Sequence, residues 1–258
     1  MRVTWIGTGA AGGIPLYGCH CAACELALIH PTCRRQPCSA LIEAGNTKIL
    51  LDAGLTDLTE RFPPSSLSAI LLTHFHPDHV QGLFHLRWGV GKKIVVYAPP
   101  DSEGCADLYK HPGLLEFRHL VKFKSFHVDG LTITPLPLIH SKPTFGYALE
   151  DASGTRIAYL TDTAGLPPKT EIFLRDWQAS VLVLDCMYPP LPVAPTNHND
   201  LTLALTTIEA VDPGETWLTH IGHEFDAWLI DNEKSLPPCV SIARDGEVIE
   251  VSKGGRGM

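Results

Sequence analysis

The chain has 258 residues, and its 28 acidic and 20 basic side chains give a net charge of −8 alongside 13 histidines and 8 cysteines. With 45% hydrophobic and 19% charged residues, the composition excludes disordered and fibrous proteins. An acidic chain without a long run of Lys or Arg does not hold nucleic acid by neutralising phosphates. An anionic substrate would therefore need a local positive field, which metal ions could supply.

No apolar run approaches the ~20 residues that span a bilayer, which excludes a helical membrane protein. Residues 1–15 are interrupted by glycines and do not resemble a signal peptide. Eight cysteines without an export signal favour reduced thiols and metal binding over disulfides. We therefore expect a cytoplasmic protein.

Short apolar runs rich in Val, Ile and Leu alternate with turn residues along the chain, and each predicts a strand. The predicted strands cover residues 3–6, 39–44, 48–51, 69–73, 94–98, 131–138, 145–150, 156–161, 180–185, 216–219 and 239–243. Helical patterns predict helices over 105–110, 169–177 and 201–210, the last with an N-cap at Asn199–Asp200. Because no linker or repeat interrupts this order, we expect a single domain over residues 1–258.

A glycine-rich loop from Gly7 to Gly12 follows the first predicted strand and matches G-x-G-x-x-G. A dinucleotide site also needs a helix beginning at those glycines and an acidic residue ~20 positions later. Gly13 and Pro15 disfavour the helix, and the later acidic residue is missing. We expect instead a tight turn that brings the backbone close to another segment.

Four side chains of the kinds that bind metals follow the predicted strand 69–73, namely His74, His76, Asp78 and His79. Alternation along an extended segment places His74 and His76 on one side. Pro77 then turns the chain, so that Asp78 and His79 can face a second, adjacent ion. This density of ligands predicts a metal site. We expect surface positions for the isolated histidines His30, His85, His111, His119 and His127.

The pattern H-x-H-x-D-H, from His74 to His79, resembles the signature of the metallo-β-lactamase superfamily. In that family the remaining ligands follow later strands as a His, a bridging Asp and a last His. The matching positions here are His140, Asp162 and His220, each just past an apolar run. Asp52 matches an early Asp that orients a histidine ligand in that family.

This resemblance implies an α/β fold, specifically a four-layer αββα sandwich with two metal ions at one edge of the sheets. It implies that Asp162 bridges the two ions. The other ligands would divide between them, with His74, His76 and His140 on one ion and Asp78, His79 and His220 on the other. Nitrogen and oxygen ligands suit Zn²⁺, Mn²⁺ or Fe²⁺.

Three cysteines, Cys19, Cys21 and Cys24, are spaced to reach one tetrahedral ion, which needs a fourth ligand. The candidates for that ligand are His20, His30, Cys33, Cys38 and His223. We favour His223, because it follows shortly after His220 and would tie the N-terminal loop to the catalytic strand end. The alternative is a group of free or buried thiols. We thus predict a structural Zn²⁺ in a loop over about residues 19–38.

A narrower resemblance is carried by the cysteine cluster together with Arg34–Ser39, Leu86–Gly91, His140–Lys142 and Phe225–Leu229. These segments closely resemble the phosphoribosyl cyclic phosphodiesterases of the carbon–phosphorus lyase pathway. The resemblance implies a phosphodiesterase of phosphonate catabolism that converts 5-phospho-α-D-ribosyl 1,2-cyclic phosphate to ribose 1,5-bisphosphate. It implies two Mn²⁺ at the catalytic site, with Zn²⁺ or Fe²⁺ as alternatives, and Zn²⁺ in the cysteine site.

Two adjacent cations can hold a bridging hydroxide that attacks phosphorus and can stabilise the displaced oxygen. His198 matches the catalytic histidine of this enzyme group, where it protonates the leaving oxygen, and its alternative is a surface residue beside a helix cap. Asp78 could share proton handling while binding a metal. Arg34, Arg35 and Lys142 are candidates for holding the 5-phosphate, and each has a plain surface charge as its alternative.

Two other functions compete with this hypothesis. A tRNA 3′-processing endonuclease shares the histidine pattern, but the chain lacks a long basic insertion to grip RNA. A non-catalytic metal-binding module is disfavoured by the intact ligand set. We expect a small-molecule cyclic phosphodiester as partner, neither nucleic acid nor membrane, and relatives point to a homodimer.

Overall fold

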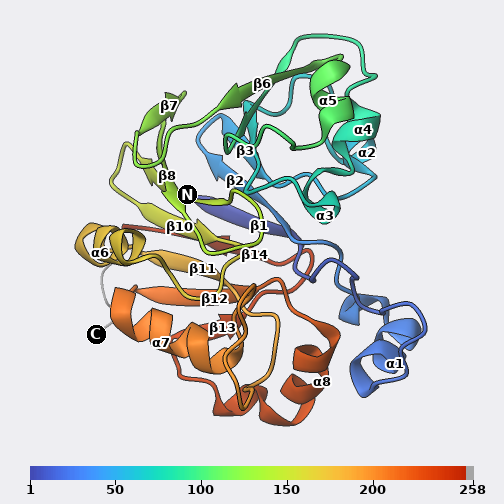
Figure 1. The fold of residues 1–258 in the computed structure, drawn as a ribbon, viewed down its shortest axis with the longest axis vertical. Helices are drawn as coiled ribbons and strands as arrows, with labels where there is room; N and C mark the ends of the chain where they lie inside the picture. The colour runs from blue at the N-terminus through green and yellow to red at the C-terminus, as the bar shows by residue number, and fades with distance from the viewer. Residues whose placement is uncertain (254–258) are drawn as a thin grey trace.

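The computed structural model describes residues 1–253, which form two mixed seven-stranded sheets (Figure 1). In spatial order, the first sheet contains β14 (Val248–Glu250), β1 (Arg2–Gly7), β2 (Ser39–Ala44), β3 (Thr47–Leu51), β4 (Ala69–Leu71), β5 (Ile94–Ala98) and β6 (Leu115–His119). The second contains β13 (Val240–Ile242), β12 (Glu215–Thr219), β11 (Val181–Asp185), β10 (Arg156–Leu160), β9 (Phe145–Asp151), β8 (Leu131–Pro137) and β7 (Phe126–Val128).

Helices cover the outer face of each sheet (Figure 1). The first sheet is covered by α2 (Leu58–Arg61), α3 (Pro77–Val80), α4 (Leu83–Leu86) and α5 (Ala106–Lys110). The second is covered by α6 (Pro168–Trp177), α7 (Leu201–Val211) and α8 (His223–Asn232), and α1 (Ala22–Ile29) lies beside α8. The predicted four-layer αββα sandwich is therefore confirmed.

The main core lies between the two sheets, where Trp5, Ile42, Tyr147 and Tyr159 are completely buried. On its other face, each sheet packs against its helices through a further apolar layer. A strand buried on both faces cannot alternate with polar residues. This explains the sequence of β11, Val-Leu-Val-Leu-Asp, in which every residue is buried.

The strand directions bring distant parts of the chain to one sheet edge. β10, β11 and β12 are parallel, and β8 runs in the same direction because β9 is antiparallel to both β8 and β10. In the first sheet, β3, β4 and β5 are parallel. Residues that follow the carboxyl ends of these strands can therefore meet, although they lie far apart in sequence.

All eleven predicted strands are present, each within two residues of its predicted ends, as are the three predicted helices. The strands that sequence analysis missed, β6, β7 and β14, are all outermost strands. An outermost strand buries fewer side chains, so its apolar run is short. The predicted N-cap is confirmed, because the Asp200 carboxylate accepts the Leu203 N–H at 2.8 Å.

The glycine-rich loop makes the close backbone approach that we expected. A Cβ atom on Gly7 would lie 2.0 Å from the Pro37 carbonyl oxygen, so only glycine fits there. The Gly9 N–H donates to the Gln36 carbonyl at 2.8 Å. The loop is therefore packed against its own chain, with the N–H groups of Gly9 and Ala10 already bonded.

Among residues 1–253, no helix has both the length and the apolar character needed to cross a membrane. The predicted domain of 1–258 remains a prediction, and its residues 254–258 lie outside the described part of the chain.

A buried ion pair connects the N-terminal segment to α8. The Arg35 guanidinium contacts the Asp226 carboxylate at 2.9 Å and donates to the Ala243 carbonyl at 2.6 Å and the Thr8 hydroxyl at 2.8 Å. Only 3% of the Arg35 side chain is exposed. The expectation that Arg35 could hold a substrate phosphate is therefore wrong, because its donors are already bonded inside the protein.

This ion pair predicts a large stability effect. Asp226→Ala should lower the free energy of unfolding by about 3 kcal/mol, because it leaves a buried guanidinium without its counter-charge. Glu116→Ala removes an exposed ion pair with Arg118 and should cost less than about 1 kcal/mol. Urea unfolding of both variants measures the difference, and equal losses would contradict the role given to the buried pair.

Candidate metal centre

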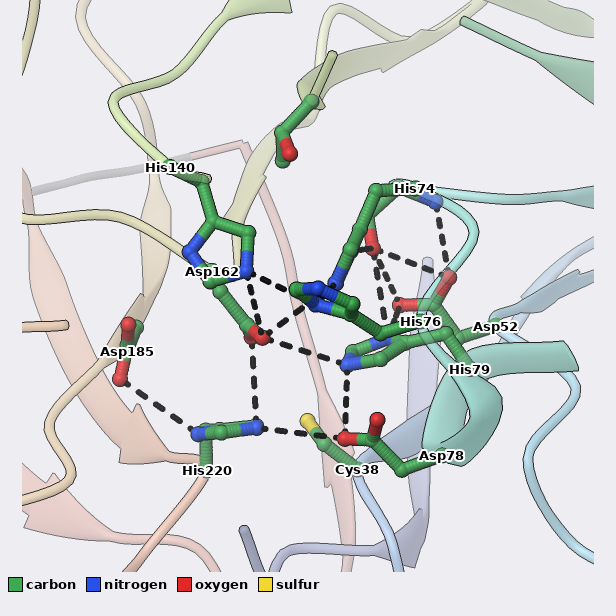
Figure 2. Close-up of polar contacts among 12 residues, drawn as sticks. Cys38, Asp52, His74, His76, Asp78, His79, His140, Asp162, Asp185 and His220 are labelled. Carbon is green, nitrogen blue, oxygen red and sulfur yellow. Dashed lines mark hydrogen bonds and ion pairs between the residues drawn. The ribbon is translucent and has the colours of Figure 1, made fainter. Parts of the chain in front are cut away.

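Histidine and aspartate side chains from the segments after β4, β8, β10 and β12 converge at the sheet edge (Figure 2). The first cluster contains His74, His76, His140 and Asp162, whose ligand atoms all lie within 4.8 Å of one another. His76 Nδ1 lies 2.7 Å from His74 Nε2 and 3.0 Å from His140 Nε2. Asp162 Oδ2 lies 3.7 Å from His74 Nε2 and 3.8 Å from His140 Nε2.

The second cluster contains Asp78, His79, His220 and again Asp162. His79 Nε2 lies 3.2 Å from Asp78 Oδ2 and 3.3 Å from Asp162 Oδ2. His220 Nε2 lies 3.4 Å from Asp162 Oδ1 and 3.8 Å from Asp78 Oδ2. Asp162 is thus the one residue shared by the two clusters, the position that sequence analysis expects for a bridging ligand.

The geometry of both clusters fits divalent cations. Ligand atoms at about 2.1 Å from a tetrahedral ion are separated from one another by about 3.4 Å. The distances here bracket that value. His79 Nε2, His220 Nε2 and Asp162 Oδ1 are also buried without a hydrogen-bond partner. Leaving such atoms unpaired is costly, and a bound cation would satisfy all three.

The pKa values show that the second cluster attracts positive charge. Burial would lower the pKa of His79, but the carboxylates of Asp52 and Asp162 outweigh it and raise the pKa well above its ordinary value. Burial is likewise outweighed at His220, where Asp162 and Asp78 raise the pKa to about 9. Because a histidine ligand must be neutral, a divalent cation would replace the protons that these carboxylates attract.

Two of the histidines are oriented through Asp52. His79 Nδ1 lies 2.8 Å from the Asp52 carboxylate, which also accepts the Thr73 N–H at 2.8 Å and the Thr73 hydroxyl at 2.9 Å. With its proton given to Asp52, the Thr73 hydroxyl can accept from His74 Nδ1 at 3.0 Å. Each ring then turns its Nε2 toward the clusters.

His140 is held by main chain from a different loop. Its Nδ1 donates to the Asn197 carbonyl at 2.9 Å, and the Asn197 amide oxygen accepts the Ser141 N–H at 3.0 Å. These two bonds fasten the loop after β8 to the loop before α7. His140 Nε2 is thereby left to face His76 and Asp162.

Sequence analysis did not single out Asp185. This residue ends the buried strand β11, and the predicted ligands likewise follow buried strands. Its Oδ2 accepts the Thr163 N–H at 2.9 Å and His198 Nδ1–H at 3.0 Å. Its Oδ1 lies 3.7 Å from His220 Nδ1 (Figure 2). One buried carboxylate therefore faces both histidines, and an acidic residue ending a buried strand was the signal for it.

His198 lies beside the two clusters. Its ring stacks on His220, with 4.8 Å between centroids and 12° between planes, and meets His140 edge to face at 5.0 Å. Its side chain is 12% exposed. With Nδ1 bonded to Asp185, His198 has Nε2 free to meet a molecule entering the site.

The backbone is strained at two positions of the site. Asp52 and His220 have φ angles of 58° and 57°, in the left-handed region that non-glycine residues rarely adopt. Such a conformation costs about 1–3 kcal/mol and persists only where surrounding contacts enforce it. Here it turns each side chain out of its strand and into the clusters.

A separate cluster joins the N-terminal loop to α8. Cys19, Cys21, Cys24 and His223 place their ligand atoms within 4.8 Å of one another. His223 Nδ1 lies 3.4 Å from Cys19 Sγ and 3.6 Å from Cys21 Sγ. Three thiols and one imidazole form a set that suits tetrahedral Zn²⁺.

The other candidates for the fourth ligand lie outside this cluster in the described structure. His20 is 85% exposed, and the buried Cys38 Sγ instead contacts the Tyr159 hydroxyl at 3.3 Å and the Thr219 hydroxyl at 3.4 Å. All eight cysteines are free of disulfides. The isolated histidines are exposed as expected, namely His30, His85, His111, His119 and His127.

Comparison with known proteins agrees with this geometry. The model of the β-lactamase superfamily domain matches residues 47–221. A diphosphatase described as a member of the PhnP family superposes with a TM-score of 0.81, at 26% identity, over 96% of this chain and 97% of that chain. Zn²⁺-bound PqqB from Methylobacterium extorquens superposes with a TM-score of 0.78, at 20% identity, over 97% and 100%.

Among curated proteins, an octanoyltransferase of Porphyromonas gingivalis is 28% identical over 99% of this chain but only 53% of that protein. The chain spans about half the length of the first curated relatives that it matches.

The bridging position of Asp162 predicts how metal content responds to mutation. Asp162→Ala should remove both ions of the His/Asp clusters, because each loses a buried charged ligand, while the cysteine-bound ion remains. Elemental analysis of the purified variant would measure the change. Full retention of all ions would contradict the bridging assignment.

For a variant of the cysteine cluster we predict the opposite change in metal content. Cys21→Ala should remove the zinc of that cluster and lower the melting temperature by about 4–8 °C, which corresponds to about 2 kcal/mol in a chain of this size. The ions of the His/Asp clusters should remain. Cys239→Ala, at an exposed cysteine outside the cluster, is the matched control. Unchanged zinc in Cys21→Ala would refute the site.

Proposed function

Since the chain belongs to the metallo-β-lactamase superfamily, we propose that it is a phosphodiesterase acting on 5-phospho-α-D-ribosyl 1,2-cyclic phosphate. The reaction gives ribose 1,5-bisphosphate. The observation that carries the proposal is a paired His/Asp cluster with a carboxylate-held histidine, His198, at its side. The similarity to a diphosphatase of the PhnP family supports a phosphorus centre as the site of reaction.

Cations in the two clusters would lower the pKa of a water molecule and neutralise charge on phosphoryl oxygens, which is what hydrolysis of an anionic diester requires. The resemblance in sequence favours Mn²⁺ in these clusters and Zn²⁺ in the cysteine cluster. This positive charge matters because the chain itself carries a net charge of −8. An anionic diester is therefore attracted to this edge rather than to the protein as a whole.

His198 is the proposed proton donor. Hydrolysis breaks one phosphorus–oxygen bond of the cyclic ester, and the departing sugar oxygen needs a proton. Asp185 holds His198 through Nδ1, so that the ring can present its Nε2–H to that oxygen. Asp185 acts through His198 and is thus a positioning residue.

Asp78 is suited to hold a cation. Burial would raise its pKa, but the facing imidazoles of His220 and His79 lower it far below its ordinary value. Asp78 is therefore ionised at neutral pH. A carboxylate with so low a pKa is a weak base, so the shared role in proton handling that the sequence suggests stays a prediction.

The function is tested with three substrates offered to the Mn²⁺-loaded protein. We expect turnover of the ribosyl cyclic phosphate and of bis-p-nitrophenyl phosphate, with loss of both after chelation. A precursor tRNA tests the endonuclease alternative. Cleavage of the tRNA alone would overturn the proposal, and no turnover by a fully loaded protein would favour a non-catalytic metal-binding module.

The roles of His198 and Asp185 predict a dependence on the leaving group. His198→Ala should lower kcat for the ribosyl cyclic phosphate by about 10²–10⁴-fold. Asp185→Asn should lower it by about 10–100-fold, because a neutral amide replaces the carboxylate and can turn its N–H groups toward the histidine, so that the ring is no longer held in one orientation. Both losses should be much smaller for bis-p-nitrophenyl phosphate, whose leaving group needs no proton.

Metal content provides the control for these two variants, because Asp185 also faces His220. Equal losses on both substrates, at full metal content, would show that His198 is not the proton donor.

A further inference from the structure

Of the three cationic candidates for a second phosphate, the structure excludes Arg35 and favours Lys142 over Arg34. Arg35 is buried in bonds to Asp226 and Ala243. Arg34 donates through Nε to the Ala27 carbonyl at 3.1 Å and so belongs to the loop that carries the cysteine cluster. Lys142 remains, and it follows His140 of the first cluster by two residues.

Lys142 is anchored by a buried carboxylate. Asp101 Oδ1 accepts the N–H groups of Glu103 and Gly104 at 3.0 and 2.9 Å, which fixes the loop after β5. Its Oδ2 is buried without a hydrogen-bond partner and lies 3.9 Å from Lys142 Nζ. The Asp101 side chain is 6% exposed, so its charge needs a neighbouring cation.

This ion pair lies at the edge of the metal centre. The loop after β5 contacts the histidine segment, because Cys105 Sγ lies 3.9 Å from the Phe75 carbonyl. Ser141, the neighbour of Lys142, places its hydroxyl 3.5 Å from His76 Nε2. Two residues span at most about 7 Å of backbone, so Lys142 Cα lies within that distance of His140 Cα.

The exposure of the residues around the clusters shows where a substrate can enter. His74 and His79 are completely buried, whereas Ser141 is exposed and His76 and His198 are partly exposed. The open side is therefore lined by His76, Ser141 and His198. Lys142 adjoins this side, its side chain is 27% exposed, and its ammonium lies 3.9 Å from Asp101 Oδ2.

We infer that Lys142, held by Asp101, binds a second phosphate group on the substrate, remote from the phosphorus that reacts. This inference rests on the proposed phosphodiesterase function and names a specificity-determining residue for it. An ammonium that already neutralises a buried carboxylate stays close to one position. A phosphomonoester arriving from the open side then completes its coordination with charge-assisted hydrogen bonds.

The test compares two substrates that differ only in that group: 5-phosphoribosyl 1,2-cyclic phosphate and ribosyl 1,2-cyclic phosphate. The measured quantity is the ratio of their kcat/KM values in the Mn²⁺-loaded protein. Lys142→Met should reduce the ratio by about 10-fold or more, because one charge-assisted hydrogen bond is lost. Lys142→Arg should restore most of it, and Asp101→Asn should reduce it by a smaller factor.

Lys253→Met is the matched control, because Lys253 lies beside Gly154 in the turn between β9 and β10, at the opposite sheet edge. It should leave the ratio as in the parent. An unchanged ratio in Lys142→Met, or equal losses on both substrates, would overturn the inference while the phosphodiesterase function stands. Failure of the parent to hydrolyse either substrate would overturn the function and the inference together.

Discussion

The structure depends on one buried charge, the carboxylate of Asp162, which is 2% exposed. Burial would raise its pKa, yet His220 and His79 lower it well below its ordinary range, so it is ionised. A buried anion is tolerated only when compensating positive charge and hydrogen bonds surround it. The histidines of the two clusters supply that compensation, and two cations held there would give the site a net positive charge. Cations bound in the two clusters would thus also neutralise the buried charge of Asp162.

The compensation is built from both sheets at once. Asp52 follows β3 of the first sheet and orients His79, whereas Asp185 ends β11 of the second sheet and faces His220 and His198. Neither carboxylate belongs to the two His/Asp clusters described above. Each fixes which ring nitrogen carries a proton and therefore which nitrogen is free. The positions of the histidines consequently depend on how the two sheets are placed relative to each other. The apolar core between the sheets maintains that placement.

Sequence could predict the layers of this fold because strands buried on both faces, such as β11, read as unbroken apolar runs. The ligand-type residues were predictable because they follow those runs. The outermost strand β14 and the helix α8 were missed, since their stability comes from tertiary contacts rather than from a local pattern. Asp185 was missed although it ends a buried strand, because its partner His198 lies on a loop and the strand pattern does not show which residue the carboxylate faces. Arg35 was wrongly considered as a phosphate ligand, because sequence cannot show that a charged side chain is buried.

The glycine-rich loop contacts the segment that joins the second His/Asp cluster to the cysteine cluster. Its Ala10 N–H donates to the Ile221 carbonyl at 3.0 Å, and the Ile221 N–H donates to the Thr8 carbonyl at 2.8 Å. Ile221 lies next to His220 of the second cluster and shortly before His223 of the cysteine cluster. The short segment between β12 and α8 thus carries a ligand of each centre. The glycine-rich loop holds this segment through the two backbone hydrogen bonds of Ile221. Because His220 has a strained left-handed backbone, its position depends on these neighbours. A metal ion bound at the cysteine cluster would therefore help to fix the position of His220 through the backbone.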